Sequence, residues 1–86
     1  MPQLINKNGL VISDNIKAIQ DELIRGTGFV MGEKVSIFLE RETLHEKNIV
    51  ISIDEENGVS TEKRFVVEQM NEALELFQRL LKKQPQ

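Results

Sequence analysis

The residues best suited to chemistry are one histidine and a set of carboxylates. His45 is the only histidine, and it lies in a polar segment beside Glu46, where we expect a solvated loop residue instead of a general base. The chain has no cysteine, which excludes a thiol nucleophile, a disulfide and a thiolate zinc site. The sequence therefore predicts neither a nucleophilic triad nor a transition-metal centre.

Carboxylates that neighbouring strands could bring together are the remaining candidates for acid–base catalysis. They are Glu40, Glu42, Asp54 and Glu56. The densest group, Asp54-Glu55-Glu56, lacks the glycine that a calcium loop of the EF-hand type needs at its sixth position, which is Val59 here. A small sheet with two helices also offers little volume in which to bury a carboxylate and raise its pKa. We therefore predict solvated turns and charged strand edges, with no catalytic residue, no metal and no cofactor.

The segment 26–32, Gly-Thr-Gly-Phe-Val-Met-Gly, has glycines spaced as in some phosphate-binding loops. Such loops follow a strand and open a helix, whose N-terminus attracts the anion. This segment instead follows a predicted helix and leads to a predicted strand, so it would place an anion at a helix C-terminus. We predict a helix C-cap followed by a loop or bulge.

Aromatic and basic residues give a weak indication of nucleic-acid binding. The chain has four Phe and no Tyr or Trp, and Phe65 and Phe77 are expected in the core. Phe38, flanked by Arg41 or by Lys63 and Arg64, is therefore the best candidate for stacking on a base. The net charge of -3, from 11 Lys and Arg against 14 Asp and Glu, opposes general attraction to phosphate. Nucleic-acid binding is therefore kept as the alternative function.

The predicted order of helix, three strands and helix is similar to that of double-stranded-RNA-binding domains. Those domains carry a lysine cluster at the start of their final helix. The corresponding stretch here is Glu68-Gln69-Met70-Asn71-Glu72, whose charge repels phosphate. The sequence is therefore assigned to no family.

Two stretches have the hydrophobic spacing of amphipathic helices. Residues 14–25 place Ile16, Ile19 and Leu23 on one face, with Ser13 as the expected N-cap. Residues 69–83 carry a wider apolar arc, which repeats at intervals of three and four residues. The first helix is predicted to be the shorter of the two.

Alternating hydrophobicity predicts strands at 34–40, 49–54 and 63–67. Asn57-Gly58 indicates the turn between the last two strands. A type I′ loop would place Val66 and Arg64 opposite Ile49 and Ile51, whereas a three-residue loop with left-handed Gly58 would bring Phe65 opposite Ile49, which is the register we favour. Asn8-Gly9 indicates a further hairpin, so residues 1–12 are either a flexible arm or an edge strand.

These elements predict an α+β fold with an antiparallel sheet of three strands, or four if the N-terminus contributes one. A C-terminal amphipathic helix and a shorter N-terminal helix pack on the sheet. The 86 residues, 40% hydrophobic and 29% charged, suit one globular domain over 1–86 with a disordered tail at 84–86. The absence of cysteine, of a signal peptide and of a long apolar run favours a cytoplasmic protein that does not enter a membrane.

Elimination of these chemistries leaves a small non-enzymatic protein-interaction or regulatory module. The apolar arc of the second predicted helix exceeds what one sheet face covers, which leaves Leu76 and Leu80 beside the small Ala73. We expect Ala73, Leu76 and Leu80 to contribute to a homodimer interface. The alternatives are that the two leucines stay exposed to solvent or that the first predicted helix covers them within one chain. An unidentified protein is the second expected partner. An enzyme ranks third, after nucleic-acid binding through a sheet face or a strand hairpin.

Overall fold

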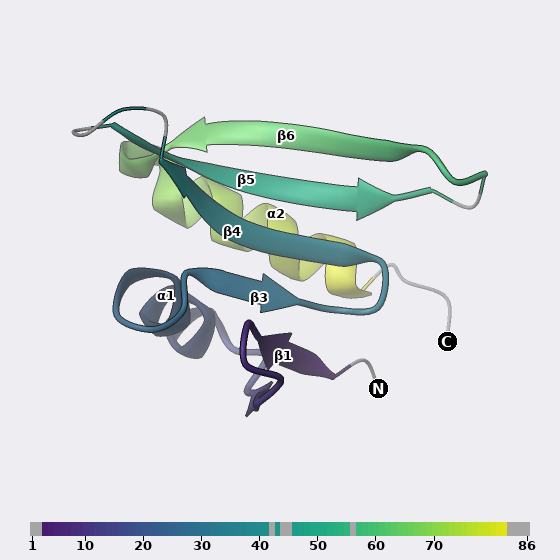
Figure 1. Ribbon diagram of the computed structural model, residues 1–86, viewed down its shortest axis with the longest axis horizontal. Helices are drawn as coiled ribbons and strands as arrows, with labels where there is room; N and C mark the ends of the chain where they lie inside the picture. Colours follow the sequence, from purple (N-terminus) through teal and green to yellow (C-terminus); the bar gives the residue numbers. More distant parts are fainter. Residues whose placement is uncertain (1–2, 42, 44–45, 56, 83–86) are drawn as a thin grey trace.

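The alternating segments form one antiparallel sheet, and both α-helices lie on the same side of it (Figure 1). The computed structural model describes residues 3–41, 43, 46–55 and 57–82, so the tail predicted at 84–86 lies outside the described residues. The elements in chain order are β1 (Leu4–Asn6), β2 (Val11–Ile12), α1 (Ile16–Ile24), β3 (Phe29–Met31), β4 (Val35–Arg41), β5 (Lys47–Asp54), β6 (Ser60–Val66), the short 3-10 helix η1 (Val67–Gln69) and α2 (Met70–Lys82).

The sheet has six strands in the order β2-β1-β3-β4-β5-β6, so the prediction of three or four strands is wrong, although the fold is α+β as expected. The additional strands are β1, β2 and β3, each only two or three residues long. Strands this short show too little alternation to be recognised from sequence. β3 lies within the 26–32 segment that was predicted as a C-cap followed by a loop or bulge. Because of β3, four strands instead of three lie between α1 and α2 in chain order. The similarity in element order to double-stranded-RNA-binding domains is therefore lost.

Two left-handed glycines set the hairpins that the Asn-Gly pairs predict. In the β1–β2 hairpin the Asn6 N–H donates to the Leu10 carbonyl at 2.9 Å, and Gly9 has a φ of 84°. In the β5–β6 hairpin Gly58 has a φ of 83°, a conformation that costs glycine little. The register pairs Ile49 with Phe65, as favoured from the sequence.

The helices begin and end close to the predicted positions. Asn15, not Ser13, caps α1, because the Asn15 Oδ1 accepts from the Ala18 N–H at 2.8 Å; the Ser13 hydroxyl instead accepts from the Asn15 amide. α2 runs from Met70 to Lys82 against the predicted 69–83. Across the described residues, no helix is both long and apolar enough to cross a membrane.

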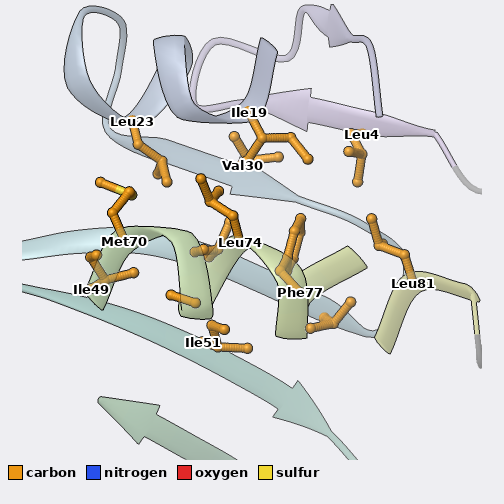
Figure 2. Close-up of a cluster of buried hydrophobic side chains, with 13 residues drawn as sticks. Leu4, Ile19, Leu23, Val30, Ile49, Ile51, Met70, Leu74, Phe77 and Leu81 are labelled. Carbon is orange, nitrogen blue, oxygen red and sulfur yellow. The ribbon is translucent and has the colours of Figure 1, made fainter. Parts of the chain in front are cut away.

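The core fills the space between the sheet and the two helices (Figure 2). α2 crosses β4, β5 and β6, while α1 lies over β3 beside it. Phe77, Leu74 and Ile19 have no exposed surface, and they meet the buried strand residues Val30, Ile37, Ile49 and Ile51. Burial of each of these large side chains contributes about 1.5–3 kcal/mol, which explains how a chain without disulfides holds this sheet.

Candidate interaction surface

Of the four carboxylates considered for catalysis, the structure describes Glu40 and Asp54, and these two do not lie together. Glu40 pairs with Arg64, whereas Asp54 lies at the far end of β5, where its Oδ1 accepts from the Ser60 hydroxyl at 3.1 Å. Among the described residues, no group of three histidines, cysteines or acids is placed to hold a metal ion. His45, Glu42 and Glu56 lie outside the described residues.

The three residues assigned to self-association lie on the core side of α2. Ala73 is completely buried, so it belongs to the core and offers no surface to a partner. Leu76 and Leu80 are half-buried, and both pack against the same hydrophobic core. The other components of this core therefore already cover a large part of the apolar arc that the sequence left unassigned.

No described element covers the face of the sheet that points away from both helices, which we call the open face. Because side chains alternate along a strand, Val30 and Ile37 point into the core while their neighbours Met31 and Ser36 point to the open face. The same register places seven apolar side chains there, namely Ile5, Val11, Phe29, Met31, Phe38, Val50 and Val66. Val11 is 65% exposed and Met31 40%, so part of this group is in direct contact with solvent.

A cross-strand row of side chains forms the centre of the open face. Phe29 pairs with Phe38, Phe38 with Val50 and Val50 with Arg64, across β3, β4, β5 and β6. The two phenyl rings stack with centroids 6.0 Å apart and planes 26° from parallel. Val50 is fully buried although it is not part of the core under the helices. The open face therefore has a small packed apolar centre of its own.

Charged side chains border this centre on the β6 side. The Arg64 guanidinium contacts the Glu40 carboxylate at 3.3 Å and the Glu62 carboxylate at 3.1 Å. Glu40 first, and Glu62 second, raise the pKa of Arg64 above its ordinary value. Two carboxylates around one guanidinium leave this rim with one net negative charge.

A polar network fixes the β1 end of the sheet. The Glu22 carboxylate, in the last turn of α1, accepts from the Thr27 N–H at 2.6 Å and from the Thr27 hydroxyl at 2.8 Å. Asn6, which is 8% exposed, donates its amide to Glu22 at 3.5 Å, and its own Oδ1 accepts from the N–H groups of Asn8 and Leu10. This network joins the β1–β2 hairpin to the loop between α1 and β3.

Sequence reasoning identified Phe38 and Arg64 as candidate contact residues but missed Phe29, Met31 and Val11. The reason is that 26–32 was taken as loop, so Phe29 had no assigned face. The signal that the sequence contains for this strand is the apolar triplet at 29–31 between two glycines, which is too short to show a period.

No protein-family model, no curated protein and no solved structure matches this chain.

Proposed function

We propose that this protein is a non-enzymatic interaction module that binds another protein on its open face. The observation that carries this proposal is the position of both helices on one side of the sheet, which leaves the stacked Phe29 and Phe38 on the other. Exposed apolar side chains grouped on a rigid sheet, with charged groups at the rim, are typical of protein-binding surfaces.

The strand pairing supports the proposal because it makes this surface rigid. β4 pairs with β5 over seven residues, and β3 is held against β4 by three. Aromatic side chains fixed by a ladder lose little conformational entropy when a partner covers them. Phe29 and Phe38 therefore meet the requirements for a central anchor, with Ser36 and Ser52 beside them as small polar neighbours.

Site-specific crosslinking tests the proposal directly, because the chain has no cysteine of its own. A benzophenone attached to Ser36→Cys reports contacts of the open face, and one attached to Glu75→Cys on the outer side of α2 is the matched control. We expect a discrete protein adduct from position 36 that disappears when Phe38→Ser is added. Adducts that are the same from both positions, or that persist in the Phe38→Ser background, would show that the open face is not the binding surface.

Single-stranded nucleic acid is the second candidate, favoured by one observation: Arg64 lies in the same cross-strand row as the stacked phenyl rings. Stacking platforms for bases combine such rings with nearby cations. Here Glu40 and Glu62 neutralise that cation, which ranks this candidate below a protein partner. Competition with labelled single-stranded and duplex DNA and RNA at two salt concentrations decides between them. Binding that weakens steeply with salt and requires Phe38 would favour nucleic acid.

A further inference from the structure

The outer edge of β6 carries backbone groups that no strand of the described chain pairs with, since β6 ends the sheet order. Which groups point outward follows from the hairpin. Asp54 donates its N–H to the Lys34 carbonyl on the β4 side, whereas Glu55 donates to Val59 across the hairpin, at 2.8 Å in each case. Along an antiparallel strand, the backbone N–H and C=O groups of successive residues point alternately to one neighbouring strand and to the other. The groups that face outward are therefore those of Ser60, Glu62, Arg64 and Val66.

We propose that a second copy of this chain pairs with this edge, β6 against β6, in an antiparallel arrangement about a two-fold axis. Outward groups must meet outward groups, which restricts the register to pairings in which the two residue numbers have an even sum. If the axis passes beside Glu62 or Arg64, that residue faces its own copy and like charges meet. If it passes beside Lys63, Glu62 of each copy faces Arg64 of the other.

The Lys63-centred register is supported by charge and by apolar surface. It brings Glu62 of each copy opposite Arg64 of the other on the open face, in addition to the ion pairs that Arg64 makes with Glu40 and Glu62 of its own chain, and each Glu62–Arg64 pair can exchange main-chain hydrogen bonds. It also brings the start of one strand beside the end of the other, so Val59 approaches Val67 of the second copy. Val59 is 55% exposed and Val67 44%, and both lie at the ends of this edge. A single arrangement thus satisfies the charges, the central hydrogen-bonding groups and the apolar ends.

Two features of the same register oppose association. Lys63 faces Lys63 of the second copy on the opposite side of the strand, where like charges oppose pairing. The Val66 N–H already donates to the Gln69 Oε1 at 3.2 Å, so the outermost pairing gains less than the central one. Charged residues on edge strands also protect many proteins from strand addition, and that role for Glu62, Lys63 and Arg64 is the competing explanation. The two explanations predict opposite oligomeric states.

The experiment is a mixture of two charge-reversal variants, Glu62→Arg and Arg64→Glu. Each variant alone would place like charges opposite each other. In a one-to-one mixture, the arginines at positions 62 and 64 of the first variant face glutamates of the second at both symmetric positions. We expect the wild-type protein to sediment at about twice 9.9 kDa at about 100 µM, each variant to associate about tenfold more weakly, and the mixture to recover the wild-type mass. Far-UV circular dichroism confirms that each variant is folded.

Two further measurements do not depend on those variants. Lys63→Thr removes the like-charge contact and should strengthen association about threefold. In the wild-type protein, amide exchange at Glu62 and Arg64 should slow as concentration rises, while exchange at the inward-facing Lys63 should depend less on concentration. A monomer mass for the wild type at about 100 µM overturns the proposal. So does a one-to-one mixture of Glu62→Arg and Arg64→Glu that does not regain the dimer mass of the wild type. Neither result bears on partner binding at the open face, which the crosslinking experiment tests separately.

Discussion

Glu22 provides the most informative perturbation of the fold, because its carboxylate joins the N-terminal hairpin to α1. It accepts two hydrogen bonds from Thr27 and one from Asn6. The hydrogen bonds from the Thr27 backbone and hydroxyl, in that order, hold the pKa of Glu22 below its ordinary value of 4.5, and the Asn6 amide adds to this effect. Glu22→Gln keeps the shape of the side chain and removes its charge.

The expected loss of stability follows from these contacts. A hydrogen bond to a charged group contributes about 1.5–3 kcal/mol. The amide oxygen of Gln can still accept from Thr27, although without the charge, whereas its NH2 group cannot accept from Asn6, and solvent partly reaches this side chain. We therefore expect Glu22→Gln to lower the free energy of unfolding by about 1 kcal/mol at neutral pH. With a urea m-value of about 1 kcal/mol/M, the midpoint should fall by about 1 M.

The pH dependence has a definite sign. Because the folded-state pKa lies below the unfolded value, the stabilisation is fully present above about pH 4.5 and is lost as the pH falls through the folded-state pKa. The difference between wild type and Glu22→Gln should therefore narrow as the pH is lowered.

The assay is urea unfolding followed by far-UV circular dichroism, since the chain has no tryptophan or tyrosine. Asp21→Asn, an exposed acid-to-amide change in the same helix, is the control for the overall loss of one charge. A midpoint for Glu22→Gln that equals that of the control, or a difference that does not change with pH, would refute this account of the network.

Further substitutions test three separate parts of the fold. Gly58→Val should lower the free energy of unfolding by more than about 1 kcal/mol, because a β-branched residue tolerates the φ of 83° poorly, and an unchanged denaturation midpoint would reject the turn. Asn15→Ala should cost about 1 kcal/mol by removing the cap of α1, with Asn15→Asp retaining most of it; equal urea midpoints for the two variants would argue against the cap. Leu80→Asp should lower the thermal midpoint of the monomer, because this half-buried side chain packs on the core, whereas the same change at the fully buried Phe77 should prevent folding; equal behaviour of the two would contradict the packing.

The sequence by itself determined the long elements and two turns. α2 and the strands β4 and β5 have strong periodicity, which reflects burial of one face and needs no knowledge of neighbours. The Asn-Gly pairs located both hairpins because glycine readily adopts positive φ, and the choice of loop at Gly58 then set the Ile49–Phe65 register.

The number of strands and the nature of the surface were decided by tertiary structure. β1, β2 and β3 become strands through pairing with other strands. The β1–β3 pair, in which Ile5 lies opposite Met31, joins segments that are far apart in the sequence. Local propensity cannot contain such non-local pairing.

The same limit applies to the candidate site. The sequence indicated Phe38 and Arg64 as candidate contact residues from their aromatic and basic character. The contact of Phe29 with Phe38 depends on the pairing of β3 with β4. From the sequence, the surplus apolar surface was expected on α2. In the structure Ala73 is buried, and the apolar side chains of the open face lie on the side of the sheet away from α2. Which face remains open depends on where both helices pack, and that is a property of the assembled core, which no single segment specifies.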